Sequence, residues 1–138
     1  MKPVLVDTGC IVALLDRSER NHARCAQAVA DIQGPLVTCE AVIAESCYLL
    51  RSLKGAPEAV VQNVARGVFQ IPFHLDEHAP AVVALLRKYR TVPMDLADAC
   101  LVHLASLLET GKILTLDQDF AIYRWRRNRA FENLLAIS

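Results

Sequence analysis

Residues 2–9 read Lys-Pro-Val-Leu-Val-Asp-Thr-Gly, and this short stretch decides the class of fold. Its centre, Val4 to Val6, is apolar at every position, which is typical of a strand in a parallel sheet covered on both faces. We therefore predict a buried strand over Lys2–Val6 that ends directly before Asp7. In an open parallel sheet, ligands bind beyond the carboxyl ends of the strands, so this acid lies where a ligand site forms.

Outward from this strand, the chain alternates between amphipathic segments and short apolar runs. Helix-period patterns bounded by Gly and Pro predict helices, and short runs rich in Val, Ile and Leu predict strands. The apolar run Ile11–Leu15 is assigned to neither class. Strands separated by helices indicate an α/β fold with a mainly parallel sheet. Helices are predicted at 19–32, 41–53, 57–66, 80–90 and 96–108, and further strands at 36–38, the centre of 68–75, 112–116 and 134–137.

The composition limits the class of protein. A length of 138 residues fits one domain, so residues 1–138 are expected to form a single domain. A hydrophobic fraction of 54% suffices for a packed core, which excludes intrinsic disorder. Fifteen Lys and Arg balance fifteen Asp and Glu, which argues against binding to nucleic acid through bulk positive charge.

No segment of the sequence predicts a membrane span or a secretion signal. Ala99–Leu108 is the longest stretch without a charged residue, whereas a span needs about 20 apolar residues. Asp7 comes too early for a signal peptide. The five cysteines are odd in number and form no CxxC pair, so we interpret them as small buried residues of a reducing compartment. These patterns predict a cytoplasmic protein without a membrane partner.

Two acids are predicted at the ends of strands. Asp7 follows the first strand, and Asp117 follows the strand predicted at 112–116. Each also has a structural interpretation, because Asp is a good N-cap and a common turn residue. Their shared position beyond parallel strands favours a common pocket.

Glu45 lies on the helix predicted at 41–53, and its neighbours three and four positions away include no cation. A carboxylate facing Val42 and Leu49 would lose hydration, which costs several kcal/mol or raises its pKa strongly. We therefore interpret Glu45 as functional. The alternative is a side chain at a helix edge that reaches water.

Asp98 repeats this pattern on the helix predicted at 96–108, again without a neighbouring Lys or Arg. Its structural interpretation is stronger, because Asp95 after Pro93 is a good N-cap. Asp98 then occupies position N3, where an acid suits the helix dipole. Because Asp98 also faces the apolar stripe of the helix, it stays a functional candidate.

Four carboxylates gathered in one pocket would repel one another, so that some bind protons or a cation joins them. Ligation by oxygen alone favours hard ions such as Mg²⁺ or Mn²⁺. Zinc would need several His or Cys ligands, and we interpret His74 and His78 as surface residues.

Four short segments carry these acids: V-D-T-G at 6–9, C-E-A-V-I-A-E at 39–45, P-M-D-L-A-D-A at 93–99 and T-L-D-Q-D-F at 115–120. Together they resemble the PIN domain family, and most closely the VapC-type toxin ribonucleases of VapBC toxin–antitoxin modules. The resemblance covers nearly the whole chain. It implies a three-layer α/β/α sandwich with a mainly parallel sheet and one shared acidic pocket. Gly9 stands where many members of the family carry Ser or Asn.

The resemblance also implies an activity and partners. The expected activity is an endoribonuclease that depends on Mg²⁺ or Mn²⁺ and leaves a 5′ phosphate and a 3′ hydroxyl. RNA is the expected substrate, a cognate antitoxin the expected protein partner, and a homodimer the expected assembly. The implied catalytic and metal-binding acids are Asp7, Glu45, Asp98 and Asp117, and the supporting residues are Thr8, Asp95, Thr115 and Asp119.

Residues 124–129, Arg-Trp-Arg-Arg-Asn-Arg, form the only dense positive run of the sequence. In one interpretation Arg124, Arg126 and Arg127 contact RNA phosphates while Trp125 stacks on a base. In the other, the run is a solvated surface loop with Trp125 packed in the core.

Other functions that use a similar fold fit this sequence less well. A phospho-receiver domain needs neighbouring acids after the first strand and a Lys at the end of a late strand, whereas Lys112 begins its strand. A haloacid-dehalogenase-type phosphatase needs Asp at the position of Gly9. The alternative that stays open is a catalytically weak or inactive PIN module that binds nucleic acid or a protein partner.

Overall fold

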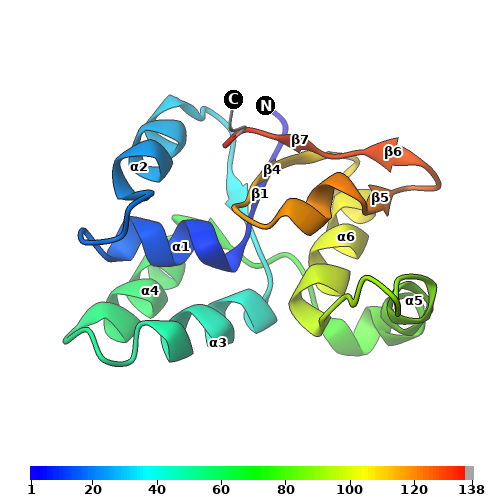
Figure 1. The fold of residues 1–138 in the computed structure, drawn as a ribbon, viewed down its shortest axis with the longest axis horizontal. Coiled ribbons are helices and arrows are strands. Elements are labelled where there is room, and N and C mark those ends of the chain that lie inside the picture. Colours follow the sequence, from blue (N-terminus) through cyan, green and yellow to red (C-terminus); the bar gives the residue numbers. More distant parts are fainter. Residues whose placement is uncertain (136–138) are drawn as a thin grey trace.

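The computed structural model describes residues 1–135 (Figure 1). A sheet of five parallel strands forms its centre, in the order β3-β2-β1-β4-β7. A two-stranded antiparallel hairpin, β5 and β6, forms a separate small sheet. The strands are β1 (Val4–Val6), β2 (Leu36–Val37), β3 (Phe69–Gln70), β4 (Lys112–Leu114), β5 (Arg124–Trp125), β6 (Arg129–Ala130) and β7 (Glu132–Asn133).

Helices cover both sides of the sheet. In Figure 1, α1 to α4 lie together on one side of the strands, and α5 and α6 lie on the other. The predicted three-layer α/β/α fold with a parallel sheet is therefore confirmed. The helices are α1 (Thr8–Leu15), α2 (His22–Asp31), α3 (Glu40–Leu49), α4 (Ala56–Ala65), α5 (Leu75–Lys88) and α6 (Leu96–Leu108), and η1 (Gln118–Ala121) is a 3₁₀ helix.

The most deeply buried elements are β1 and α6. All three residues of β1 are buried, as its continuous apolar pattern predicts. Leu101 and Leu104 of α6 are as completely buried as Leu5 of β1. Full burial of a side chain of this size contributes about 1.5–3 kcal/mol to folding. This packing fixes the two backbones from which Asp7 and Asp98 extend.

The topology places β1 and β4 at a switch point. The connection after β1 leads to β2 on one side, whereas the connection after β3 returns to β4 on the other side of β1. Ligands of open α/β sheets bind at such a point, outside the carboxyl ends of the strands. Asp7 directly follows β1, and Thr115 and Asp117 follow β4.

Two predicted helix starts are wrong. The helix predicted at 80–90 begins at Leu75 and contains Pro80, because Asp76 and Glu77 suit the dipole of an earlier first turn. The helix predicted at 19–32 begins at His22, and the unassigned run Ile11–Leu15 belongs to helix α1. The chain reverses between these two helices, in a turn where Asp16 accepts hydrogen bonds from the Ser18 amide and hydroxyl.

Several other boundaries shift by a few residues. The helix predicted at 41–53 ends at Leu49, and the strand predicted at 112–116 ends at Leu114. The third strand lies at 69–70 rather than at the centre of 68–75. The C-terminal strand is 132–133 rather than 134–137, of which 136 and 137 lie outside the described residues.

The predictions for Cys and His hold in part. All five cysteines are free thiols, and four are buried while Cys47 is half-buried. His74 is exposed as predicted, but His78 is not a free surface residue. Its Nδ1 lies 3.1 Å from His103 Nε2, and its ring stacks on Phe73, because the early start of α5 turns it toward α6. Within residues 1–135, no helix has the length and apolar character needed to cross a membrane.

Candidate metal centre

The register of the sheet brings Asp7 next to Thr115. Val6 pairs with Leu114, so the residues that follow them lie side by side. The Thr115 hydroxyl donates a hydrogen bond of 2.8 Å to Asp7 Oδ2, and the Thr8 amide donates one of 2.7 Å to Asp7 Oδ1. Both oxygens of this buried carboxylate are therefore oriented. Asp7 is also the N-cap of α1, so its structural interpretation applies as well.

Thr115 orients a second acid through the same hydroxyl. Its Oγ1 accepts a hydrogen bond of 2.9 Å from the Asp117 amide. Asp117 is the N-cap of η1, where its Oδ1 accepts from the Asp119 amide at 2.9 Å. The turn that follows β4 thus holds the partly exposed Asp117 carboxylate beside Asp7.

Asp98 reaches the same place from the first turn of α6. Asp95 Oδ1 accepts a hydrogen bond of 2.8 Å from the Asp98 amide, and Asp98 Oδ2 faces the Asp95 amide at 3.5 Å, which makes a capping box. The hydroxyl of Tyr123, a side chain with no exposed surface, donates a bond of 3.0 Å to Asp98 Oδ2. Asp98 is therefore both a helix cap and a buried member of the acidic group.

Three of the four predicted acids converge closely. One carboxylate oxygen from each of Asp7, Asp98 and Asp117 lies within 4.8 Å of the other two. These residues are far apart in the sequence and come from the ends of β1, α6 and β4. No other group of three acidic, His or Cys side chains within residues 1–135 is as close.

Glu45 lies at the rim of this group rather than within it. Its Oε1 accepts a hydrogen bond of 2.7 Å from the Thr8 hydroxyl, which ties α3 to the start of α1. The prediction that Glu45 loses its hydration is wrong, because its side chain is exposed. Its helical neighbours Tyr48 and Leu49 are exposed as well, so they do not enclose it in apolar surroundings.

Two of the converging acids hold protons more tightly than an ordinary Asp. Burial raises the pKa of Asp7 to about 6, against the hydrogen bonds from Thr115 and Thr8, which lower it. Burial, together with the charges of Asp95 and Asp7, raises the pKa of Asp98 to about 7. Desolvation and like charge thus both oppose the ionised form of the group.

The chemistry of this group fits a hard divalent cation. A cavity of about 290 Å³ opens over the acids, and its lining contains five carboxylates and no Lys, Arg or His from the described residues. Asp oxygens are the ligands that Mg²⁺ and Mn²⁺ prefer. A bound cation would favour the ionised carboxylates, which burial and mutual repulsion disfavour in its absence. The lining acids are Asp7, Glu45, Asp95, Asp98 and Asp117.

The order and position of these acids agree with a known family. The family model of the PIN domain matches residues 4–125. The chain belongs to the PIN domain family. Ribonuclease VapC26 of Mycobacterium tuberculosis is 29% identical to it over 117 residues, which are 83% of this chain and 87% of that relative. The predicted resemblance to VapC-type PIN domains is confirmed.

A solved structure of the family shares the fold. The crystal structure of VapC20 of Mycobacterium tuberculosis, described as a Sarcin-Ricin loop cleaving toxin, matches with a TM-score of 0.78. The match covers 86% of this PIN domain and 93% of the VapC20 chain at 17% sequence identity. At this identity the comparison supports the arrangement of the helices and strands.

The remaining predicted supporting acids of the PIN domain differ in position. Asp95 is exposed and lines the acidic cavity, whereas Asp119 is absent from that lining. The backbone carbonyl of Asp119 instead accepts a hydrogen bond of 3.1 Å from the Tyr123 amide. Sequence reasoning missed Tyr123, although its hydroxyl contacts Asp98. An isolated Tyr beside a basic run gives no signal of this contact, which depends on how η1 folds back against α6.

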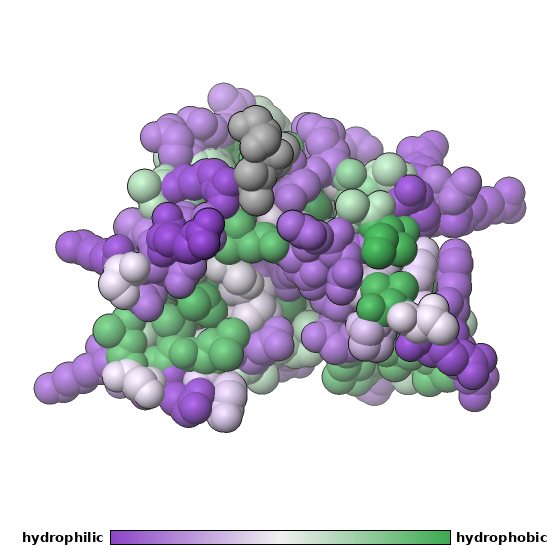
Figure 2. Space-filling model, viewed as in Figure 1, coloured by the Kyte–Doolittle hydropathy of each residue, from purple (hydrophilic) through white to green (hydrophobic). Residues whose placement is uncertain are grey.

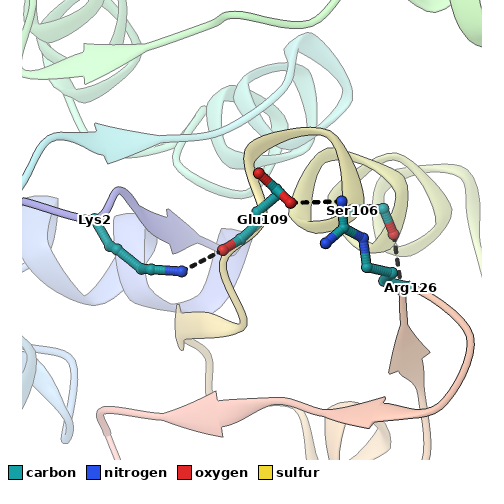
Figure 3. A network of polar contacts seen from close by, with 4 residues as sticks. All are labelled: Lys2, Ser106, Glu109 and Arg126. Carbon is teal, nitrogen blue, oxygen red and sulfur yellow. Dashed lines mark hydrogen bonds and ion pairs between the residues drawn. The ribbon is translucent and has the colours of Figure 1, made fainter.

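The basic run forms the β5–β6 hairpin and its turn. Trp125 is buried, so it is packed in the core as the second interpretation predicted and cannot stack on a base. Arg124 Nη1 donates to the carbonyls of residues 121, 122 and 123. Arg126 forms an ion pair of 2.6 Å with Glu109, and its amide donates to Ser106, as Figure 3 shows. Arg127 is exposed and has no such contact with the described residues.

Replacing Thr115 by Val is expected to weaken Mn²⁺ binding about 10- to 100-fold, because it removes the group that orients both Asp7 and Asp117. Calorimetric titration of Mn²⁺ measures the change. Thr110→Val is the matched control, since Thr110 is equally buried but donates to the Pro3 carbonyl. Equal Mn²⁺ affinity in the two variants would show that Thr115 does not position the acids.

Proposed function

We propose that this PIN domain is an endoribonuclease that depends on Mg²⁺ or Mn²⁺ and acts as the toxin of a toxin–antitoxin pair. The observation that carries the proposal is the convergence of Asp7, Asp98 and Asp117 within 4.8 Å at the switch point of the sheet. The names of the relatives, a ribonuclease and a toxin that cleaves the Sarcin-Ricin loop, support the choice of RNA as substrate.

Asp7, Asp98 and Asp117 would hold the ion, with Glu45 at the rim. When bound, a divalent ion of this kind lowers the pKa of a coordinated water and offsets negative charge on phosphate oxygens. Asp7 and Asp98 would hold the ion in their ionised forms, since carboxylates ligate as anions. Thr115 and Tyr123 hold the two side chains in place while the charges change.

The exposed position of Glu45 suits a role as the general base that acts on the attacking water. The Thr8 hydroxyl fixes Oε1, which leaves Oε2 without a hydrogen bond to any described residue. Oε2 can accept a proton from the water as it attacks the phosphate. Ser46 is not available as a nucleophile, because its hydroxyl is fully buried and donates to the Val42 carbonyl. The bond between phosphorus and the 3′ oxygen would break, and the leaving oxygen would take a proton from solvent, which gives a 5′ phosphate and a 3′ hydroxyl.

We propose two protein partners, a cognate antitoxin and a second copy of the chain. In support, exposed apolar side chains gather on α3, α4 and the turn between them, and Figure 2 shows a hydrophobic area at this part of the surface. Contiguous apolar surface of this kind marks interaction sites. We also propose that residues 1–138 form one domain that acts in the cytoplasm. The exposed apolar residues are Tyr48, Leu49, Leu53 and Val61.

Incubation of the purified protein with total RNA tests the activity directly. We expect discrete cuts in Mg²⁺ or Mn²⁺ and none in EDTA, with 5′ phosphates at the new ends. Mapping of the fragment ends identifies the cleaved RNA. Binding of RNA without cleavage in either metal would contradict the proposal and identify the chain as an inactive PIN module.

Of Arg124, Arg126 and Arg127, we expect Arg127 to contact an RNA phosphate, because the other two are engaged within the protein. Arg127→Ala should reduce the slope of log affinity against log salt by about 1. Arg66→Ala removes the same charge from the end of α4 and should leave the slope unchanged. RNA binding measured by fluorescence anisotropy from low to moderate salt gives both slopes. An unchanged slope for Arg127→Ala would show that Arg127 does not contact RNA and that the hairpin is simply exposed to solvent.

A further inference from the structure

A second cavity adjoins the acidic one and has a different character. It has a volume of about 480 Å³ and lies between η1 and β7. Leu116 and Asp117 line both cavities, so the two lie next to each other after the end of β4. Its volume falls within the range typical of sites for small organic ligands.

The wall of this cavity offers an aromatic ring. Phe120 is buried and meets Phe131 edge to face, with ring centroids 5.3 Å apart. Phe120 also packs edge to face on Tyr123, so its position is fixed by the core. Phe131 is only half-buried, which leaves part of its ring facing the cavity.

The rim of the cavity offers an unengaged amide. Gln118 lines it, is exposed, and makes no side-chain hydrogen bond with the described residues. The other amide, Asn133, is engaged: its Nδ2 donates to the Thr115 carbonyl, and its Oδ1 accepts from the Thr115 amide. Asn133 therefore fixes the wall, and Gln118 is the amide that can pair with a ligand.

The charge of the lining decides what kind of ligand fits. Asp117, at the border with the acidic cavity, is the only charged residue in the lining among residues 1–135. A cavity without cations does not attract a phosphate. An aromatic wall and one free amide suit a flat, neutral, hydrogen-bonding group, which is the description of a nucleobase.

We propose that this cavity holds the base of the nucleotide next to the scissile phosphate. Phe131 stacks on the base, and the Gln118 amide pairs with its edge. The inference rests on the proposed ribonuclease function, because the acidic group sets where the phosphate lies. It makes Phe131 and Gln118 determinants of which sequence the enzyme cleaves.

Binding of 2-aminopurine riboside, a neutral fluorescent nucleoside, tests the site without a phosphate or a metal ion. In EDTA, we expect saturable quenching of its fluorescence by the wild-type protein. Phe131→Leu keeps the apolar volume but removes the ring, and should weaken binding roughly tenfold. Gln118→Ala should weaken binding too, whereas Gln62→Ala, an exposed amide on α4, should not.

A second readout is the sequence at the cut sites in a random RNA pool. Gln118→Ala should relax the base preference at one position beside the cut. Equal quenching by the wild-type and Phe131→Leu proteins would overturn the proposal. So would tighter binding of N-acetyltryptophanamide than of the nucleoside, since that would indicate a site for a protein side chain.

The two proposals fail in different ways. RNA cleavage without nucleoside binding would leave the ribonuclease intact and remove the base site. Nucleoside binding that depends on Phe131, in a protein that cuts no RNA in Mg²⁺ or Mn²⁺, would keep the base site and remove the ribonuclease.

Discussion

Asp98→Asn is expected to lower RNA hydrolysis by at least about a hundredfold, because it removes one of three ligand oxygens of the proposed metal centre. The fold should persist, since an Asn oxygen can still accept from the Tyr123 hydroxyl. The same change should stabilise the metal-free protein at pH 8. Burial raises the pKa of Asp98 to about 7, so at pH 8 the folded protein holds a charge that opposes folding.

Three measurements test this expectation together: cleavage of the mapped RNA, far-ultraviolet circular dichroism, and urea denaturation in EDTA at pH 8. Asp76→Asn is the matched control, because Asp76 occupies the first turn of α5 but is exposed. It should retain cleavage and gain no stability. Unchanged metal-dependent cleavage by Asp98→Asn would remove Asp98 from the site.

The metal-free protein is expected to lose stability as the pH rises from 4 to 8. The folded-state pKa values of Asp7 and Asp98, about 6 and about 7, lie above the ordinary value of 3.8. Between these values the folded state binds more protons than the unfolded state, so the free energy of unfolding falls with rising pH. For the buried Asp7, the shift from 3.8 to about 6 corresponds to about 3 kcal/mol.

Urea denaturation in EDTA at pH 5 and pH 8 measures this dependence. Other groups also titrate in this range, so the wild-type protein is compared with the Asp7→Asn, Asp98→Asn double variant. The free energy of unfolding should fall less between pH 5 and pH 8 in the double variant. Mn²⁺ at a hundred times its dissociation constant should restore about 2.7 kcal/mol at pH 8 in the wild-type protein only. Parallel pH profiles for the wild-type and double-variant proteins would contradict the electrostatic account.

Much of the acidic site follows from patterns that are local in the sequence. A strand with two covered faces must be continuously apolar, so the first polar residue after Val6 marks the end of β1. An acid three residues after a capping Asp falls on the first turn of a helix, which places Asp98. Asp117 lies in the turn that follows the short strand β4, three residues after Leu114.

Other features depend on contacts between distant segments. Glu45 was predicted to be desolvated from its helical neighbours alone. Of those neighbours Val42 is buried, but Tyr48 and Leu49 are exposed, so the helix face around Glu45 is open to water. The contact of Tyr123 with Asp98 depends on the path of the chain after η1. Neither the exposure of Glu45 nor the Tyr123 contact can be predicted from composition or periodicity. Composition carries no positions, and periodicity relates only residues within a few positions of each other.

The cavity between η1 and β7 was likewise not predicted from the sequence. Its walls come from η1 and from residues 131–133, which have no common periodic pattern. The sequence pointed instead to the basic run, where the structure uses Arg124 and Arg126 to hold its own turn. Of the three arginines predicted to contact RNA, only Arg127 therefore stays a candidate.

Calorimetric titration of Mn²⁺ at pH 6.5, in two buffers of different ionisation enthalpy, tests most directly whether the three carboxylates form one metal site. The account predicts saturable binding whose heat depends on the buffer, because Asp7 and Asp98 release protons when the ion binds. It also predicts that Asp7→Asn weakens binding at least about a hundredfold. Absence of saturable binding, or equal affinity in the two proteins, would contradict it.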